Sequence, residues 1–195
     1  MDLSQSSIAA IATCTAVFVG LVLCCLPRSA PFFSLRNRVV VITGGSSGIG
    51  KAVGLEAARR GAHVVLLARS VQPLVDAVAE IKAVAENTQR VLQYSVDVTN
   101  EEKTRAALKQ AAADCGGRVD VLVCSAGTSS PREFTATSSA EFESVVRLNL
   151  FGTRNAIAAA LPFMSGAEGG RVVLISSQAG QVGLYGYTAY SVRKG

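Results

Sequence analysis

Tyr190 and Lys194 are the residues whose types and spacing most directly suggest chemistry. Residues four apart on a helix lie on one face. A free tyrosine has a pKa of about 10, and a neighbouring lysine ammonium together with a positively charged oxidised cofactor would favour the phenolate. The phenol could then serve as a general acid towards an alkoxide that forms by hydride transfer. Ser176 and Ser177, at the end of a predicted strand, could hold the reacting oxygen.

A second chemical stretch, residues 43–50, reads Thr-Gly-Gly-Ser-Ser-Gly-Ile-Gly. It follows four β-forming residues at 39–42 and precedes a segment with helical spacing. Glycines let the backbone turn tightly and approach phosphates, and the start of a helix offers unpaired N–H groups and a positive dipole end. The stretch therefore predicts a dinucleotide-binding loop. A flexible Gly/Ser connection without a ligand is the alternative.

Two residues at later strand ends bear on which dinucleotide binds. Sites of this kind often place a carboxylate after the second strand, but this chain has Arg69 there. A guanidinium suits a 2′-phosphate through a charge-assisted fork, so NADP(H) is favoured over NAD. A solvated strand end is the alternative for Arg69. Asp97, after the third strand, could accept from the adenine amino group or cap the next turn.

These residues require a parallel sheet to bring them together. Five apolar stretches alternate with segments of helical spacing, which predicts βαβ units with helices on both faces. In one helix we expect Ile49, Val53 and Ala57 to face the sheet, with Gly61 closing it. The expected strands are 38–43, 63–68, 90–94, 119–124 and 171–176. The expected helices are 48–60, 71–86, 100–113, 139–149, 152–164 and 188–195, of which 139–149 and 152–164 form either one long helix or two in tandem. Ligands in such sheets bind at the carboxyl ends of the strands.

The N-terminal region has a different character, since residues 8–26 carry no charge. As a helix they would span about 28 Å, close to the hydrocarbon thickness of a bilayer. A cleaved signal peptide is the alternative, but a positive region before the stretch is missing. Basic residues follow it and predict a cytosolic domain. We therefore expect a short segment 1–7, a transmembrane anchor 8–26, a linker 27–37 and one domain from 38 to 195.

Composition limits the other classes of function. The chain of 195 residues carries 19 basic and 14 acidic residues, a formal charge of +5, with a mean hydropathy of +0.35. The basic residues are scattered along the sequence, which argues against nucleic-acid binding. The five cysteines and the lone His63 show no metal-ligand or disulfide spacing, so we expect neither.

The glycine stretch 43–50, the Ser177-to-Tyr190 spacing and Tyr190-Ser-Val-Arg-Lys194 together resemble the short-chain dehydrogenase/reductase family, over residues 38–195. The resemblance implies a Rossmann-type doubly wound sheet and a nicotinamide cofactor. It implies an adenine contact for Asp97, a proton-relay role for Asn149, and substrate orientation by Ser177, with Ser176 adjacent. Tyr190 would be the acid/base, and Lys194 would bind the nicotinamide ribose. The implied loop residues are Gly44, Ser46, Ser47, Gly48, Ile49 and Gly50.

The chain departs from the family pattern in two places. Cys124-Ser125 stands where the family has two asparagines, and Ser125 could replace part of the missing hydrogen bonding. The sequence also stops one residue after Lys194, so we expect the family's last strands to be absent. A fragment and a natural truncation are both open, and a non-catalytic nucleotide-binding remnant is one alternative.

The stretch from Ser176 to Tyr190 is similar to that of 3-ketodihydrosphingosine reductases, membrane-anchored enzymes of sphingolipid synthesis. This resemblance implies NADPH as cofactor, a long-chain ketosphinganine as substrate, and the endoplasmic reticulum membrane as location, with the domain facing the cytosol. A membrane reductase of steroids or retinoids is the alternative, and an oligomer is possible.

Overall fold

The structure is a computed structural model that describes residues 33–164 and 169–194. The chain divides into two units, Met1–Phe33 and Ser34–Gly195, and the helices and strands described below belong to the second. The predicted membrane anchor at 8–26 lies outside the described residues. Among the helices that are described, none is both long and apolar enough to cross a bilayer.

Five parallel strands form one sheet in the order β3-β2-β1-β4-β5. Their registers align the strand ends, so that Thr43 of β1 lies beside Leu67 of β2 and Cys124 of β4. Every residue of β1 and β4 is buried, as expected for strands covered on both faces. The strands are β1 Val39–Thr43, β2 His63–Ala68, β3 Val91–Ser95, β4 Val121–Cys124 and β5 Arg171–Leu174.

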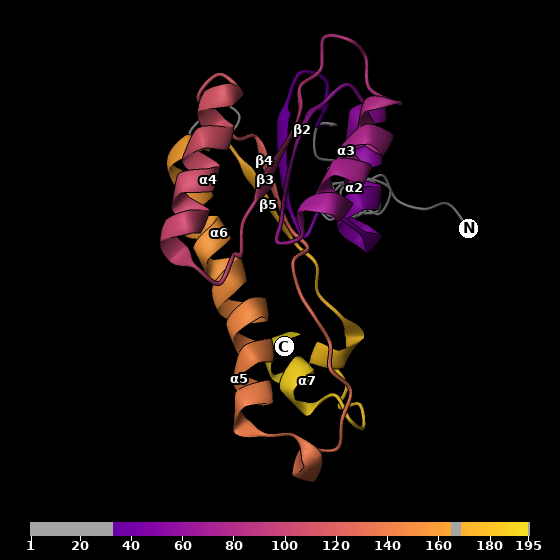
Figure 1. Cartoon of the computed structure of the whole chain (residues 1–195), viewed down its shortest axis with the longest axis vertical. Coiled ribbons are helices and arrows are strands. Elements are labelled where there is room, and N and C mark those ends of the chain that lie inside the picture. Colours follow the sequence, from indigo (N-terminus) through magenta and orange to yellow (C-terminus); the bar gives the residue numbers. More distant parts are fainter. Residues whose placement is uncertain (1–32, 165–168, 195) are drawn as a thin grey trace, which may run out of the picture. The chain divides into compact units, whose positions relative to one another are not determined.

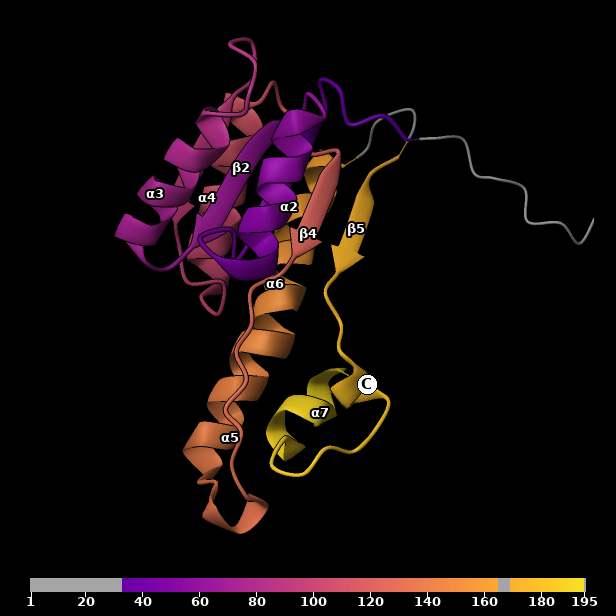
Figure 2. The same cartoon turned by 90° about the vertical axis from the view of Figure 1, so that its right-hand side faces the viewer.

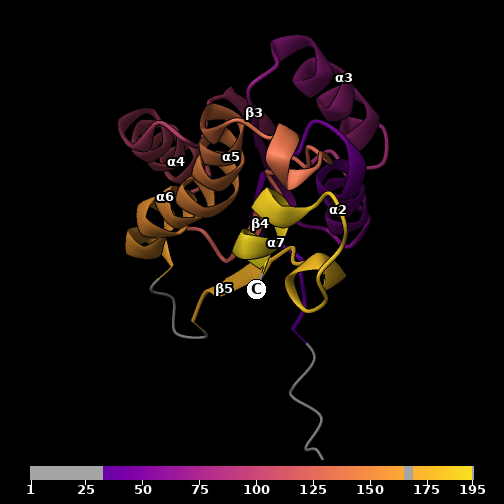
Figure 3. The ribbon, with the colours of Figure 1, turned by 90° about the horizontal axis from the view of Figure 1, so that it is seen from below.

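Helices cover both faces of this sheet (Figures 1 and 3), which confirms the predicted doubly wound architecture. On one face lie α2 (Gly48–Arg59) and α3 (Val71–Lys82). On the other lie α4 (Glu101–Asp114) and α6 (Gly152–Ala160), which pack against each other. Short side chains allow this close packing, because Ala111, Ala112 and Ala156 are fully buried under the sheet.

The strand order reverses between β1 and β4. In an open parallel sheet the loops that leave two such strands diverge to opposite faces and open a crevice at their carboxyl ends. In Figure 2 the arrowhead of β5 points towards α5 (Ser139–Val146) and α7 (Thr188–Lys194), so these helices lie beyond the same edge. The fold therefore directs the predicted chemical residues to one place.

Local capping signals explain several helix boundaries. Asn100 begins α4 by accepting a hydrogen bond from the Lys103 backbone N–H at 2.9 Å, as its residue type predicts. Gly61 ends α2 with φ of +82°, which a glycine adopts at little cost. The Ser138 and Glu141 side chains form a reciprocal capping box at the start of α5. The hydrogen bonds from Ser138 hold the pKa of Glu141 below its usual value.

One expectation about helices is wrong. Ile49 does not face the sheet: it is 59% exposed, and Gly50, Gly54 and Ala57 are buried instead. The helix lies so close to the sheet that only small residues fit beneath it. Residues 139–164 favour either one long helix or two in tandem, and the π-helical turn η2 (Arg147–Phe151) connects α5 directly to α6. Such π turns often occur at functional sites.

Candidate active site

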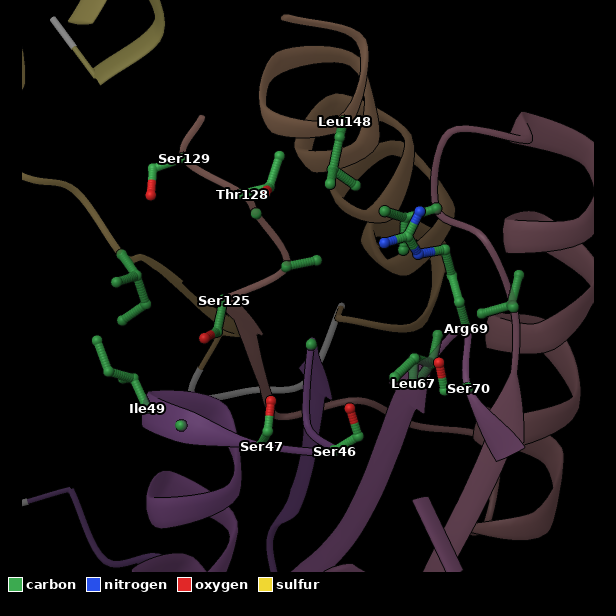
Figure 4. Close-up of a pocket in the computed structure, with 18 of the residues that line it drawn as sticks. Ser46, Ser47, Ile49, Leu67, Arg69, Ser70, Ser125, Thr128, Ser129 and Leu148 are labelled. Carbon is green, nitrogen blue, oxygen red and sulfur yellow. The ribbon is translucent and has the colours of Figure 1, made fainter. Parts of the chain in front are cut away.

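A cavity of about 430 Å³ opens at the carboxyl ends of the strands (Figure 4). The loops after β1, β2, β3 and β4 form its walls, and α7 contributes Tyr190. It therefore occupies the crevice that the strand order predicts. The residues that line it are Gly44, Ser46, Ser47, Gly48, Ile49, Leu67, Ala68, Arg69, Ser70, Val96, Val98, Ser125, Ala126, Gly127, Thr128, Ser129, Leu148, Ile175 and Tyr190.

The glycines of the loop after β1 have distinct physical roles. A Cβ on Gly44 would lie 2.7 Å from the Ala126 backbone nitrogen, and a Cβ on Gly50 would lie 2.3 Å from the Gly44 carbonyl oxygen. Both positions therefore need the smallest residue so that the loop can fold against its neighbours. Gly48 differs, because its φ is +53° and no described atom lies within 4 Å of an added Cβ. Its backbone faces open space in the cavity.

The N-terminus of α2 also faces this space. Ser47 is the N-cap residue, but its side chain makes no capping hydrogen bond. The first backbone N–H groups of the helix therefore keep their donor capacity, and the helix dipole adds positive potential. Ser46 and Ser47 lie beside them on the cavity wall (Figure 4). This arrangement fits the diphosphate of a dinucleotide.

Arg69 follows the end of β2 and lines the cavity on the side where Leu148 lies (Figure 4). It is the one charged side chain among the described lining residues, and no described carboxylate lines the cavity. Ser70 adds a hydroxyl next to it. A guanidinium beside a hydroxyl, without a competing carboxylate, suits a phosphate better than a ribose diol.

Asp97 lies beside the cavity without lining it. Val96 and Val98 form that part of the wall. The Asp97 Oδ1 atom accepts from the backbone N–H and the hydroxyl of Thr99, at 2.9 Å and 2.8 Å. The capping alternative for Asp97 is therefore observed in the structure. Each carboxylate oxygen can accept more than one hydrogen bond, so an adenine contact by this residue stays a prediction.

Asn149 is fully buried within the π-helical turn η2. Its Oδ1 accepts from the Thr128 backbone N–H at 2.8 Å, and its Nδ2 donates to the Thr128 carbonyl at 2.7 Å. The side chain therefore fixes the backbone of the loop after β4, which forms the cavity wall. Its predicted place in a proton relay is not tested by these contacts.

The loop after β4 has a second support that the sequence did not indicate. The Thr43 hydroxyl lies 3.3 Å from the Ala126 backbone nitrogen and accepts its N–H. The Thr43 carbonyl accepts from the Ser125 backbone N–H at 3.2 Å. Among the hydrogen bonds of the described residues, none uses the Ser125 hydroxyl, so the brace expected from Ser125 comes from Thr43. Only the strand register, which places Thr43 beside Cys124, could have suggested this.

Of the predicted catalytic residues, some line the cavity and others do not. Tyr190 lines it from α7, and its ring lies edge-on to that of Tyr187 at a centroid distance of 6.0 Å. Ser177 does not line the cavity: its hydroxyl accepts from the Ala179 backbone N–H at 3.2 Å and caps the turn η4 (Gln178–Gly180). Lys194 belongs to α7, but its side chain lies outside what the structure describes.

α7 is held at the cavity by contacts between two loops. The Arg132 backbone N–H donates to the Gly186 carbonyl at 2.8 Å, and the Tyr185 hydroxyl donates to Glu133. That hydrogen bond to a carboxylate raises the pKa of Tyr185. α7 also packs against α5 and η4, so Tyr190 is positioned from several sides.

The described residues contain no cluster of His, Cys, Asp and Glu side chains suited to a metal ion. Cys115 and Cys124 are both buried. Burial raises the pKa of the Cys115 thiol, which makes a thiolate unfavourable there.

Comparison with curated proteins finds reductases of a sphingoid ketone among the similar sequences. The chain is 40% identical over 162 residues to a 3-dehydrosphinganine reductase of Danio rerio, which covers 82% of this chain and 48% of the relative. It is 39% identical over 163 residues to a 3-ketodihydrosphingosine reductase of Mus musculus, with 83% and 49% covered. The chain therefore spans about half the length of these relatives.

Solved structures agree with the fold. A short-chain type dehydrogenase/reductase from Mycobacterium ulcerans matches with a TM-score of 0.78 and 33% identity, covering 83% of this chain and 59% of the other. An NAD⁺-bound xylitol dehydrogenase matches with a TM-score of 0.77 and 26% identity, covering 83% and 61%.

The family model described as short chain dehydrogenase matches residues 38–195, the whole of the predicted domain. Enzymes of this family are oxidoreductases that use NAD or NADP. The parallel sheet, the glycine loop and the cavity that Tyr190 lines agree with that match. The chain belongs to the short-chain dehydrogenase family.

Proposed function

We propose that the protein reduces the ketone of 3-ketodihydrosphingosine to dihydrosphingosine with NADPH. The reductase proposal rests on one observation: the glycine loop, Arg69 and Tyr190 line the same cavity. It combines groups for phosphate binding with a phenol suited to proton transfer. The substrate is inferred from the names of the similar curated reductases.

The described residues fit NADPH in two respects. The open space at Gly48 and the uncapped start of α2 suit the diphosphate. Arg69, with Ser46 and Ser70 on the same cavity, suits a 2′-phosphate. When bound, the cofactor would supply a hydride to the ketone carbon. The remaining task for the protein is to orient the ketone and deliver a proton to its oxygen.

Tyr190 is the proposed proton donor, because it is the acidic side chain on the cavity wall that can reach an oxygen held there. The Tyr190 phenol would donate its proton to the ketone oxygen and so neutralise the negative charge that develops on that oxygen during reduction. Lys194, four residues later on α7, would stabilise the resulting phenolate.

Two further residues have supporting roles in this proposal. The Ser177 hydroxyl accepts a hydrogen bond from Ala179 and keeps the capacity to donate one. Its proposed contact with the substrate oxygen comes from the family resemblance, since Ser177 does not line the cavity. Asn149 fixes the Thr128 backbone at the cavity wall. A relay through water from the Asn149 region to Lys194 stays a prediction from the family resemblance.

The membrane location also belongs to this proposal. Its support is the uncharged stretch 8–26 followed by basic residues. The proposed location is the endoplasmic reticulum membrane with the domain in the cytosol, where a long-chain lipid substrate partitions. Co-purification of the chain with membranes after alkaline washing is the expected result, and release by that wash would contradict the anchor.

Turnover with a panel of ketones tests the proposed function. NADPH consumption by the chain is measured with 3-ketodihydrosphingosine, a ketosteroid and retinal. We expect turnover with the sphingoid ketone, and a loss of at least about 10²-fold in kcat for Tyr190→Phe, since a proton donor contributes roughly 10²–10⁴-fold. The Tyr187→Phe variant is the matched control and should keep activity. Preference for the steroid or retinal would overturn the substrate, and equal activity of Tyr190→Phe would overturn the mechanism.

A further inference from the structure

Arginines that are scattered in the sequence gather on one edge of the folded domain. Each of the five strands begins within three residues of an arginine. Because all strands are parallel, their starts share the amino edge of the sheet, opposite to the cavity. The residues are Arg38, Arg60, Arg90, Arg118 and Arg171.

Two neighbouring arginines extend this amino edge. Arg59 precedes Arg60 at the end of α2, and Arg36 lies where the chain enters the domain. The side chains of Arg36, Arg59 and Arg60 are 64%, 58% and 54% exposed. These side chains are therefore available to a flat surface that approaches the edge.

Acidic residues neutralise part of this charge. Glu56 pairs with Arg59 and Arg60 at 3.8 Å and 2.7 Å, and Glu86 pairs with Arg36 at 3.4 Å. Exposed pairs of this kind are weak and readily exchanged for other anions. The other acids at this edge are Asp114, whose backbone carbonyl accepts from Arg90, and Asp120.

Asp120 has a different role from the exposed acids. It is 9% exposed, pairs with Arg38 and Arg118 at 3.2 Å each, and accepts from the Val39 backbone N–H at 2.7 Å. It therefore holds β1 and β4 together and is not available as a surface anion. His63, at the start of β2, lies in positive surroundings. Burial lowers its pKa, and the charges of Arg90 and Arg118 lower it further.

We propose that this amino edge docks on an anionic membrane surface. Basic residues that closely follow a membrane segment commonly bind acidic phospholipid headgroups, each strengthening partition by about fivefold. The chain enters the domain at this edge, directly after the linker to the predicted anchor. The proposal rests on that anchored location, and docking would leave the cavity at the opposite edge of the sheet facing away from the bilayer.

Hydrogen exchange in lipid nanodiscs tests the docking. The full chain is reconstituted in discs of phosphatidylcholine alone and in discs that also contain phosphatidylserine. Backbone amides near 34–38, 59–63 and 116–120 should exchange several-fold more slowly in the anionic discs, and 0.5 M salt should abolish the difference, since screening weakens surface charge interactions at that concentration to a range of roughly 4 Å. Amides of the glycine loop 44–50 should be unchanged.

A pair of charge variants provides the control. Arg36→Gln/Arg59→Gln/Arg60→Gln should lose the protection, while Lys103→Gln/Arg105→Gln/Lys109→Gln, on the exposed face of α4, removes equal charge and should retain it. Equal exchange in both disc types, equal protection of both variants, or protection of 44–50 instead would overturn the proposal. Protection by added RNA in neutral discs, without any effect of phosphatidylserine, would assign the edge to nucleic acid and overturn it too. Co-elution with neutral discs tests the anchor separately.

Discussion

We predict that cofactor choice depends on Arg69, since it is the charged side chain among the described residues that line the cavity. A bidentate guanidinium–phosphate contact contributes about 1.5–3 kcal/mol. We expect Arg69→Ala to weaken NADPH binding by roughly tenfold to a hundredfold and to leave NADH binding nearly unchanged. Fluorescence titration with both nucleotides measures the ratio.

Arg154→Ala is a suitable control for this prediction, because Arg154 is exposed on α6, away from the described cavity wall, and pairs with Glu101 at 3.1 Å. It should bind both nucleotides as the unmodified chain does. An Arg69→Ala protein that keeps its preference for NADPH would contradict the assignment of Arg69 to the 2′-phosphate.

His63 makes the stability of the fold depend on pH, and this residue does not line the cavity. Burial, followed by Arg90 and Arg118, lowers the pKa of His63 below 6.5, and the smaller influence of Asp120 opposes this. The neutral Nδ1 atom accepts from the Arg90 backbone N–H at 2.9 Å. The unfolded chain therefore takes up this proton at a higher pH than the folded chain does, so the contribution is complete above about pH 6.5 and is lost as pH falls below it.

His63→Asn keeps a hydrogen-bond acceptor but cannot take up a proton near neutral pH. Its Tm should fall less than that of the unmodified protein between about pH 7 and pH 5.5, since only the histidine titrates there. Thermal melts of both proteins at both pH values measure how the change in Tm with pH differs between them. Parallel melting curves for the two proteins would show that His63 does not contribute to the pH dependence.

In the turn between β1 and α2, position 50 leaves no space for a side chain. A Cβ at Gly50 would lie 2.3 Å from the Gly44 carbonyl, whereas a Cβ at Gly183 would meet no described atom within 4 Å. Gly50→Ala should therefore displace the loop and weaken NADPH binding by at least about tenfold, a cost of roughly 1–3 kcal/mol typical of overpacking. Gly183→Ala should bind normally, and equal binding by both variants would contradict the role of Gly50.

The elements also show which features the sequence could predict. The order of strands and helices, the Asn100 cap and the Gly61 terminus follow from local patterns, and the structure confirms them. The exposure of Ile49 and the link from Thr43 to Ala126 depend on how closely α2 and β4 approach β1, which no local pattern encodes. The hydrogen bonds of Asn149, which lies in the π turn, likewise join it to Thr128, which is distant in sequence.

The candidate site likewise contains residues whose positions could be predicted from the sequence and residues whose positions could not. Strand ends are predictable because parallel strands bring them to one edge, so Gly44, Arg69 and Tyr190 were expected near one another, and all three line the cavity. Ser177 and Asp97 do not line the cavity. The hydroxyl of Ser177 and the carboxylate of Asp97 each accept a hydrogen bond from a nearby backbone N–H instead. Such side-chain orientations depend on loop geometry, which residue spacing alone does not specify.

At the scale of the whole molecule, the sheet separates two surfaces with different chemistry. The carboxyl edge carries the cavity, and the amino edge carries the arginines that begin each strand. If the amino edge docks as proposed, the cofactor site at the opposite edge stays accessible from solvent. The two proposals can fail independently, since hydrogen exchange in nanodiscs does not depend on turnover.

Transfer of labelled hydride tests the central claim most directly. The chain is incubated with 3-ketodihydrosphingosine and NADPH that carries deuterium at the transferable position, and the lipid product is analysed by mass spectrometry. We expect dihydrosphingosine with the deuterium on the carbon that bore the ketone, and no product with Tyr190→Phe. Absence of product, or product without the label, would contradict it.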